Sequence, residues 1–378
     1  MKVAQYRWNT EGEWHPEAPA PDGEVQLALV FSGGKVLKKG GILASVKNAY
    51  PSALITGCST AGEIAGTQVS DGTGIVTAIR FDDTQVRGTQ VYINNAADSM
   101  EAGGKLAAAL NSDGLRHVFV LSDGLNINGS ELVRGLSAGL PDQVTITGGL
   151  SADGDRFQET FVVWNGAITT KAIVALGFYG NRLSVGYGSY GGWDQFGPER
   201  LVTRAVGNTV YELDNKPALA LYKRYLGEYA HGLPATALLF PLSISAQNGG
   251  VGTVRTILGV CEETGSMTFA GDVPQGSTVR LMKANFERLI DGANEAARIS
   301  LESAGSCFSP LAILISCVGR KLILKQRVEE EVESVQEVLG NQATLTGFYS
   351  YGEIAPFQPG AECELHNQTM TVTTFCEK

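Results

Sequence analysis

The chain contains the same glycine-rich motif near both ends, and each copy ends in a carboxylate. The copies are Thr56-Gly57-Cys58-Ser59-Thr60-Ala61-Gly62-Glu63-Ile64 and Thr346-Gly347-Phe348-Tyr349-Ser350-Tyr351-Gly352-Glu353-Ile354. Each follows a short apolar run, so the pattern predicts a strand that ends in a loop. Glycine permits close backbone approach to a bound group, which is typical of a ligand-holding loop. The alternative is a pair of tight turns whose hydroxyl groups cap their own backbone.

These loops and one arginine form a candidate site for a small polar ligand. Its residues are Gly57, Ser59, Thr60, Glu63, Arg320, Gly347, Tyr349, Tyr351 and Glu353. The guanidinium of Arg320 suits a carboxylate, the glutamates can accept from an amino group, and loop N–H groups can complete an anion site. The alternative is that Arg320 pairs with one of the glutamates and locks two halves of the chain together. The tyrosines can stack on a flat ligand or fill a core.

The sequence argues against catalysis. Cys58 lies where a nucleophile could stand, but thiol catalysis needs a neighbouring base, and the chain has 4 histidines in total. The sequence contains no nucleophile elbow, Walker loop or paired-histidine zinc motif. Cys363, His366 and Cys376 supply three of the four ligands that a structural zinc usually takes, so a metal site is a weaker alternative. We expect a binding protein without enzymatic activity.

The composition indicates a large globular protein of two or three domains. Of the 378 residues 43% are hydrophobic, and the formal net charge of −10 disfavours nonspecific nucleic-acid binding. No apolar run reaches the length of about 18 residues that a membrane helix needs. The first residues, Met1 to Pro21, lack the features of a signal peptide. The six cysteines form no paired motif and read as mostly reduced, buried thiols, so we expect a cytoplasmic location.

One order of elements recurs along the chain: an apolar strand, a helix, and a strand that runs into a Thr-Gly loop. It begins at Leu27, His117, Ala237 and Ala312. The third round, in which the expected strand runs from Ala237 to Leu242, lacks the helix. The strands after each loop read as antiparallel partners and not as crossover partners.

The first round also predicts a helix from Lys38 to Ala49 and a hairpin formed by residues 74–81 and 85–93. The whole pattern predicts an α/β fold of two packed domains of related units, with mixed or antiparallel sheets and helices on the outer faces.

We expect an N-terminal arm over residues 1–24, an N-terminal domain over 25–215 and a C-terminal domain over 216–378. Loops at strand ends are where such folds place ligands, so we expect a cleft lined by loops from both halves. Glu63 and Glu353 should lie near each other across it.

Several segments together resemble the FIST family, with an N-terminal and a C-terminal FIST domain. The resemblance covers roughly residues 25–375 and is carried by Gly57 to Glu63, Val202 to Ala205, Tyr211 to Asp214, Pro217-Ala218, Tyr225 to Gly227, Phe240 to Leu242, Ser316 to Arg320, Gly347 to Ile354 and Leu365 to Thr369. It implies a cytoplasmic sensory module of bacterial signal transduction that binds small ligands such as amino acids. It also implies similarity to stand-alone bacterial members that bind haem, sense nitric oxide and regulate a histidine kinase.

Haem needs an axial ligand and an apolar slot, and the resemblance makes His231 and His366 the candidate ligands. His366 lies in a motif that non-haem members can share, whereas His231 lies in a loop between a helix and a strand. The sequence does not separate the two. His15, in the arm, and His117 read as surface or structural residues. Cys317 is a third option, although its strand context favours a buried thiol.

The resemblance therefore implies a sensor that acts through a partner. No kinase, cyclase or helix-turn-helix can be recognised in the chain. We expect ligand binding between the halves to change their packing, which requires different ligand affinities in the two arrangements, and a histidine kinase to read the changed surface. The first expected ligand is haem with nitric oxide as the signal, the second is an amino-acid-like molecule, and the third alternative is a scaffold without a ligand. A homodimer is left open.

Overall fold

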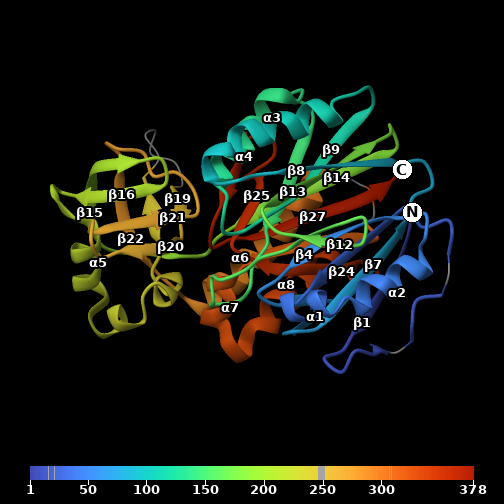
Figure 1. Ribbon diagram of the computed structural model, residues 1–378, viewed down its shortest axis with the longest axis horizontal. Helices are drawn as coiled ribbons and strands as arrows, with labels where there is room; N and C mark the ends of the chain where they lie inside the picture. The colour runs from blue at the N-terminus through green and yellow to red at the C-terminus, as the bar shows by residue number, and fades with distance from the viewer. Residues whose placement is uncertain (16, 21, 246–251, 306, 308) are drawn as a thin grey trace.

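The computed structural model describes residues 1–378 with the exception of 16, 21, 246–251, 306 and 308. Figure 1 shows a large main body and a small domain beside it. The small domain consists of residues 194–283, and the main body consists of the described residues before and after it. No helix in the described part of the chain is long and apolar enough to cross a membrane.

The main body is built from three units of the same topology. Each has an outer strand, an inner strand, one or two helices, a second inner strand parallel to the first, a hairpin, and a last strand antiparallel to the first. Unit 1 comprises β1 (Lys2–Trp8), β2 (Trp14–His15), β3 (Leu27–Ser32), α1 (Gly34–Lys39), α2 (Gly41–Ala49), β4 (Leu54–Ser59), β5 (Glu63–Ala65), β6 (Gln68–Ser70) and β7 (Gly74–Arg80).

The other two units carry an extra helix after the outer strand. Unit 2 comprises β8 (Gln85–Tyr92), the 3₁₀ helix η1 (Ala96–Asp98), α3 (Ser99–Leu110), β9 (Leu115–Ser122), α4 (Gly129–Gly139), β10 (Thr145–Leu150), β11 (Val162–Trp164), β12 (Ala167–Thr169) and β13 (Ala172–Tyr179). Unit 3 comprises β14 (Leu183–Tyr190), α6 (Phe286–Ala304), β23 (Leu311–Cys317), α7 (Val318–Leu324), η4 (Lys325–Arg327), α8 (Val328–Leu339), β24 (Thr344–Ser350), β25 (Gly352–Pro356), β26 (Cys363–His366) and β27 (Met370–Glu377).

Every hairpin leaves its own unit and pairs with a strand of another. The β5–β6 hairpin pairs with β24 of unit 3, the β25–β26 hairpin with β10 of unit 2, and the β11–β12 hairpin with β4 of unit 1. Three mixed sheets result, with the orders β12-β11-β4-β3-β7-β1-β2, β26-β25-β10-β9-β13-β8 and β14-β27-β23-β24-β5-β6. The units therefore form a closed cycle.

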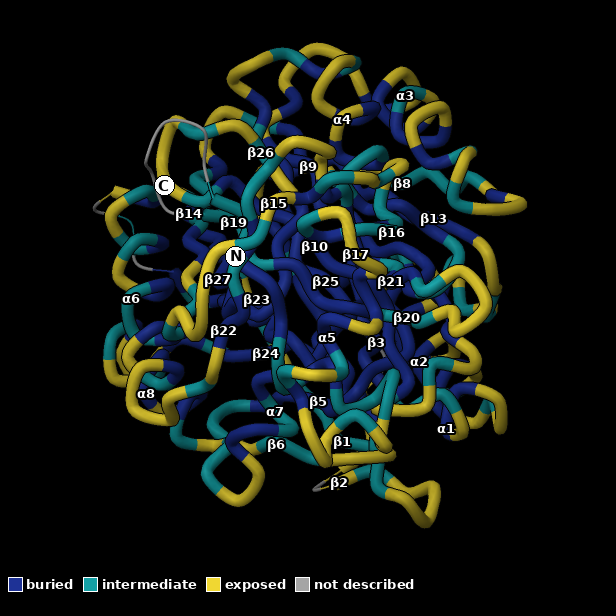
Figure 2. The backbone as a smooth tube through the Cα atoms, turned by 90° about the vertical axis from the view of Figure 1, so that its left-hand side faces the viewer, coloured by how far each residue is buried: buried dark blue, intermediate teal, exposed yellow. Residues whose placement is uncertain are grey.

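The inner faces of the three sheets meet in one hydrophobic core. Alternate residues of each inner strand point into it, as the two-residue period of a strand requires; examples are Leu27, Leu29 and Phe31 of β3 and Leu311, Ile313 and Ile315 of β23. In Figure 2 the central strands are buried and the exposed segments lie at the periphery. Helices α1 and α2, α3 and α4, and α6 and α8 cover the outer faces. The predicted fold class is confirmed.

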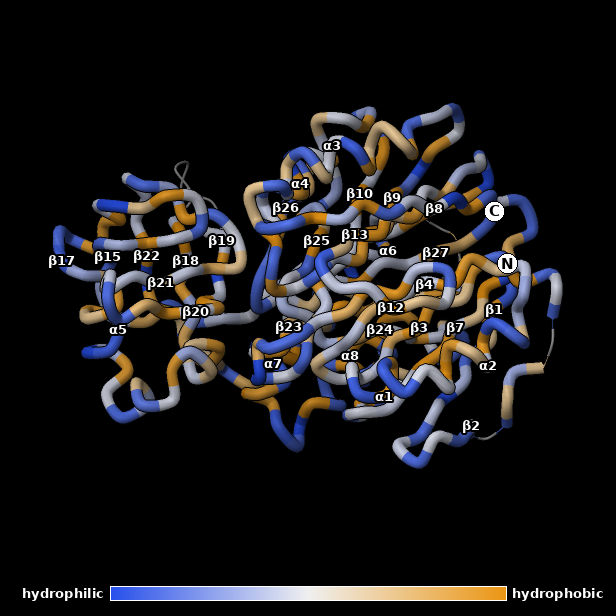
Figure 3. The backbone as a smooth tube through the Cα atoms, viewed as in Figure 1, coloured by the Kyte–Doolittle hydropathy of each residue, from blue (hydrophilic) through white to orange (hydrophobic). Residues whose placement is uncertain are grey.

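The small domain is an insertion between β14 and α6 of unit 3, and Figure 3 shows hydrophobic and hydrophilic segments mixed along its strands. It comprises β15 (Asp194–Val206), β16 (Thr209–Leu213), β17 (Lys216–Pro217), α5 (Ala218–Leu226), η2 (Gly227–Gly232), η3 (Ala235–Leu239), β18 (Leu242–Ile244), β19 (Thr253–Arg255), β20 (Ile257–Cys261), β21 (Ser266–Phe269) and β22 (Thr278–Lys283). The strands follow the order β19-β18-β22-β15-β16-β21-β20, around a core of their own. Asp194 pairs with Lys283, so the insertion leaves and rejoins the main body at one place.

Several expected elements take a different form. β7 and β8 do not form the expected hairpin, because β7 pairs with β1 and β3 whereas β8 pairs with β13 in the next sheet. Gly40, with a φ of 74°, splits the helix expected from Lys38 to Ala49 into α1 and α2. The strand expected from Ala237 to Leu242 begins as η3, because the third round belongs to the small domain and is not a repeat of the units.

The N-terminal segment contains an ordered outer strand, because β1 pairs with β7 along its whole length. Cys307 and Cys376 form a disulfide, so the expectation of reduced thiols is wrong for this pair, whereas Cys58 and Cys317 are buried free thiols. The boundary expected between residues 215 and 216 falls between β16 and β17, inside the small domain.

Candidate functional site

The glycines of the Thr-Gly motifs lie within the sheets of the three units. An added Cβ at Gly57, Gly148 or Gly347 would lie 1.8, 2.0 or 1.8 Å, respectively, from a carbonyl oxygen of the parallel neighbouring strand. Only glycine fits in such a position. Gly57 and Gly347, which the sequence assigned to ligand binding, therefore permit close packing of two strands.

The three loops after these glycines hold one another in a ring. Three equivalent hydrogen bonds close it: Ala61 N–H to Tyr349 O (2.9 Å), Tyr351 N–H to Leu150 O (3.3 Å) and Ala152 N–H to Ser59 O (2.9 Å). The ring thus repeats the same contact once per unit, and its residues are buried.

Glu63 is enclosed by its own loop. Its carboxylate accepts from the hydroxyl of Thr60, and from the N–H and the hydroxyl of Thr73 at 3.0 and 2.7 Å. Burial raises the pKa of Glu63 to about 7. The side chain is fully buried and caps a turn of its own loop.

Glu353 repeats this arrangement in unit 3. It accepts from the hydroxyl of Ser350 at 2.5 Å, and from the N–H and hydroxyl of Thr369 at 3.1 and 2.9 Å. Burial raises its pKa to about 8. In the sheets Glu63 pairs with Phe348, and Glu353 pairs with Gly149 and His366, so each carboxylate belongs to a different sheet. The two glutamates do not line the shared cleft that the sequence suggested.

Arg320 is fully buried and pairs with a residue that the sequence did not single out. Its guanidinium contacts the Glu331 carboxylate at 2.8 Å and donates to the carbonyl oxygen of Leu289 at 2.6 Å. The hydroxyl of Tyr349 donates to the same carboxylate at 2.6 Å. The expected ion pair with a loop glutamate is wrong, because the carboxylate that contacts the guanidinium is that of Glu331 on helix α8.

The remaining candidates from the two loops also have internal partners. The hydroxyl of Tyr351 donates to Asp153, and its ring stacks on Phe157 with 4.6 Å between the centroids. The hydroxyl of Ser59 accepts from Phe161 N–H at 2.9 Å. The loop residues thus form structural contacts within the protein.

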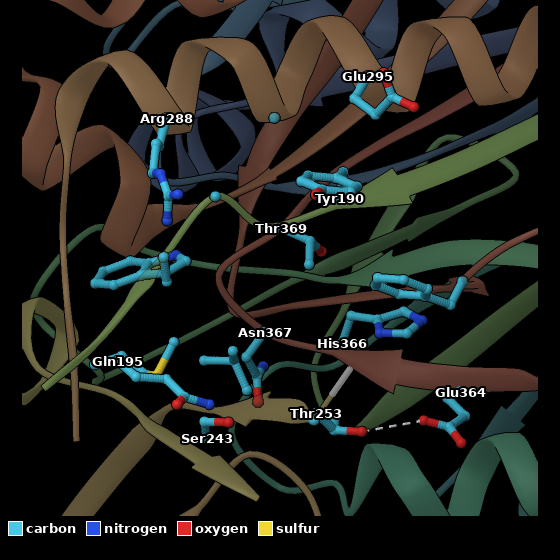
Figure 4. Close-up of a pocket in the computed structure, with 18 of the residues that line it drawn as sticks. Tyr190, Gln195, Ser243, Thr253, Arg288, Glu295, Glu364, His366, Asn367 and Thr369 are labelled. Atoms are coloured by element: carbon cyan, nitrogen blue, oxygen red, sulfur yellow. Dashed lines mark hydrogen bonds between the residues drawn. The ribbon is translucent and has the colours of Figure 1, made fainter. Parts of the chain in front are cut away.

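A cleft of about 870 Å³ lies between the small domain and the main body (Figure 4). The small domain contributes residues of β15, β18, β19 and β22, and the main body contributes the end of β14, one side of α6 and the chain around β26. This volume lies within the range of small-molecule sites. The cleft is therefore the candidate functional site.

One wall of the cleft is aromatic. The ring of Tyr190 stacks on Phe357 with 6.3 Å between centroids, and Phe357 contacts His366 with 5.7 Å between centroids. Trp193 and Met282, both mostly buried, continue this surface. A flat ligand can lie against such a wall.

The rim of the cleft is charged and mostly acidic. Its carboxylates are Asp291, Glu295, Glu362 and Glu364. Arg288, on α6, is the only arginine or lysine among the described lining residues. It pairs with Asp194 of the small domain, so this ion pair joins the two bodies. The rim is therefore suited to a ligand that carries an amino group.

His366 presents a neutral imidazole to the cleft. The side chain is buried, and this burial lowers its pKa to about 4. Because a carbonyl oxygen only accepts, the 2.8 Å contact from Nε2 to Ala355 O requires the proton on Nε2. Nδ1 is then an acceptor, and it has no hydrogen-bond partner among the described residues.

The segment from His366 to Thr369 links the cleft, the small domain and the loop ring. Asn367 accepts from Thr256 N–H of the small domain and donates to Tyr351 O of the ring, both at 3.2 Å. Thr369 lines the cleft and also holds Glu353. This segment therefore contacts the cleft, the small domain and the loop ring at once.

The two histidines that the sequence proposed are separated. His366 lies in the cleft, whereas the side chain of His231 is 86% exposed on η2, 3.9 Å from Glu228. No described residues form a cluster of three or more His, Cys, Asp or Glu that could hold a metal ion. Cys376, the third residue of the alternative zinc site, is committed to the disulfide.

Sequence reasoning found one cleft residue, His366, and missed the others. Tyr190 and Trp193 flank two glycines. This pattern indicates a tight turn between two aromatic residues and does not indicate a binding site. Arg288 and Glu295 lie about two turns apart on the same face of α6. Their pattern is that of an ordinary surface helix. No local signal shows that these segments meet.

Comparison with known protein families finds two matching domains in this chain. Residues 26–216 match the FIST N domain, and residues 218–356 match the FIST C domain. An uncharacterised protein of Methanocaldococcus jannaschii is 26% identical over 238 residues, which span 56% of this chain and 45% of the relative. The match thus covers about half the length of that relative.

Two solved structures are distantly similar in shape. A chorismatase shows 11% identity and a TM-score of 0.36 over 99% of this chain and 98% of its own. A cyanuric acid hydrolase from A. caulinodans shows 6% identity and a TM-score of 0.38 over 100% and 99%. Likeness at this level carries no argument about function.

Proposed function

Because the chain belongs to the FIST family, whose domains are sensory domains of signal transduction, we propose that it is a sensor that binds a small ligand in the cleft between its two bodies. The observation that supports this proposal is the position of the cleft, whose lining comes from both the small domain and the main body. A ligand that fits one arrangement of the bodies better than another shifts the balance between them.

The first ligand class is an amino-acid-like molecule. The acidic rim suits its ammonium group, and Arg288 suits its carboxylate. Because Arg288 otherwise pairs with Asp194 across the cleft, a ligand carboxylate would replace a contact that joins the bodies. Binding and rearrangement are then coupled through the same guanidinium.

A thermal-shift screen of amino acids tests this proposal, since a ligand bound only by the folded state raises its stability. We expect a saturable rise in melting temperature with the wild type. Arg288→Ala should weaken the apparent affinity for the amino acid by about tenfold or more. Arg182→Ala is the matched control, because Arg182 is similarly exposed and also pairs with an aspartate, Asp83, away from the cleft. No shift with any amino acid at millimolar concentration contradicts the proposal.

The second ligand class is haem, with nitric oxide as the signal. The observation in its favour is His366, a buried neutral imidazole with a free nitrogen beside an aromatic wall. His231 does not fit, because it lies on an exposed helix without an apolar slot. Haem would supply an iron that binds the diatomic gas, and His366 would hold it while the aromatic rings exclude water.

The visible spectrum after haem addition separates the two classes. A Soret band that shifts with nitric oxide, is lost in His366→Gly, returns with added imidazole and is unchanged in His231→Ala supports haem at the cleft. A protein that stays colourless, without a saturable change on haem titration, removes this class.

We also propose that the protein acts on a signalling partner, such as a histidine kinase, and has no enzymatic activity of its own. The support is indirect: the cleft holds no nucleophile paired with a base among its described residues. Co-purification with a kinase whose autophosphorylation changes on ligand addition tests the partner. An unchanged kinase rate with and without ligand would argue against it.

A further inference from the structure

Three features of the cleft together indicate which kind of side chain its ligand carries. The aromatic wall of Tyr190, Phe357 and His366 accepts a flat ring. His366 lines the cleft, and its Nδ1 is an acceptor without a hydrogen-bond partner among the described residues. Acidic residues lie on both sides of this wall, with Glu295 on α6 and Glu364 on β26 (Figure 4).

We infer that the ligand is an amino acid whose aromatic ring carries a hydrogen-bond donor, as an indole N–H or a phenol O–H does. This inference rests on the proposed function and adds the identity of the side chain. The ring lies on the aromatic wall, and its donor reaches Nδ1 of His366. The amino group then faces the acidic rim, and the carboxylate faces Arg288.

The acceptor determines the selectivity. The Ala355 carbonyl holds the proton of the imidazole on Nε2, so Nδ1 accepts and does not donate. A ring without a donor leaves Nδ1 desolvated and unpaired, and a site built to hydrogen-bond a ligand group rejects the analogue that lacks it. An aliphatic side chain also loses the contact with the wall.

Isothermal titration of the full chain with L-tryptophan, L-tyrosine, L-phenylalanine and L-leucine tests the inference. We expect tryptophan or tyrosine to bind at least about tenfold more tightly than phenylalanine, and leucine to bind most weakly. Phenylalanine within twofold of both donors, or leucine as the tightest ligand, overturns the inference and leaves the proposed function intact. No binding by any amino acid, in this set or in the wider screen, overturns both.

Two variants assign the effect to the cleft. His366→Phe keeps a ring and removes the acceptor, so it should bring the affinity for tryptophan and tyrosine down to that for phenylalanine. Tyr190→Leu should weaken all aromatic ligands about tenfold. Tyr92→Leu is the matched control, because Tyr92 ends the outer strand of unit 2 as Tyr190 ends that of unit 3, and it is exposed outside the cleft. Equal losses in Tyr190→Leu and Tyr92→Leu overturn the inference.

Discussion

Each Thr-Gly loop carries a hydroxyl residue three positions after its glycine, and the environment of this hydroxyl differs in unit 2. Thr60 donates to Glu63, and Ser350 donates to Glu353. Ser151 stands at the same place in unit 2, where its hydroxyl has no hydrogen-bond partner among the described residues. Removal of the hydroxyl at Thr60 or Ser350 thus removes a hydrogen bond to a glutamate, whereas its removal at Ser151 serves as a control.

We expect Ser350→Ala to lower the free energy of unfolding by about 1–3 kcal/mol, because it removes a donor from a buried carboxyl. Ser151→Ala should change it by less than about 0.5 kcal/mol, because its hydroxyl makes no hydrogen bond to lose. Urea unfolding of both variants measures the difference. Equal losses in the two variants would contradict the role given to Glu353.

The buried carboxyl of Glu353 also predicts a pH dependence. Its pKa is about 8 in the folded protein, against an ordinary value of 4.5, so between these pH values only the folded state keeps the proton. Its contribution to stability is complete below pH 4.5 and is lost as pH rises toward 8, by up to about 1.4 kcal/mol per pH unit.

Replacing Glu353 with Gln removes this titration. We expect the stabilities of wild type and Glu353→Gln, measured by urea unfolding, to change in parallel below pH 4.5. Between pH 4.5 and 8 the wild type should lose stability faster than the variant. Parallel curves across the whole range would show that Glu353 is ionised in the folded state.

At the scale of elements, the segment from His366 to Thr369 is one of the contacts between the two bodies. We expect Asn367→Ala to speed hydrogen exchange at Thr256 and its neighbours in the small domain, because the variant loses the acceptor of the Thr256 N–H. Exchange in β9 and β13 should not change. Asn294→Ala, which loses a bond between α6 and α8 within the main body, is the control. Uniformly faster exchange in Asn367→Ala would indicate global destabilisation and contradict a local link.

The existence of most elements could be predicted from the sequence, but their pairing could not. Apolar runs located β3, β9 and β23, and the Thr-Gly spacing located the turns after β4 and β24. The pairing of β5 with β24 joins segments that are far apart in the chain, and local patterns carry no information on it. For the same reason the short connection between β7 and β8 suggested a hairpin that does not exist.

The role of the loop glutamates was misjudged for a related reason. Their spacing showed that Glu63 and Glu353 belong to equivalent loops, which is correct. Whether such a carboxylate faces a ligand or its own turn depends on burial by other units. The cleft itself was hidden, because its aromatic wall and its rim come from segments that only the tertiary structure brings together.

At the scale of the whole molecule, the small domain is an insertion whose two ends meet. Asp194 and Lys283 are paired strand neighbours, so their Cα atoms lie about 5 Å apart. We expect a variant in which a short Gly-Ser linker replaces residues 194–283 to keep a cooperatively folded main body, with a lower melting temperature. Circular dichroism and thermal unfolding measure this. It should lose all ligand binding, and an unfolded product would show that the main body depends on the insertion.

The exchange of hairpins between units has a consequence for association between molecules. Each unit leaves one sheet edge open and carries a hairpin that fits the edge of another unit, so a second copy of the chain offers the same edges in the same geometry. A molecule whose hairpin detaches can therefore be completed by the hairpin of a neighbour. Domain-swapped oligomers are the natural misfolded form of this architecture, and they should accumulate when concentrated protein is warmed toward unfolding.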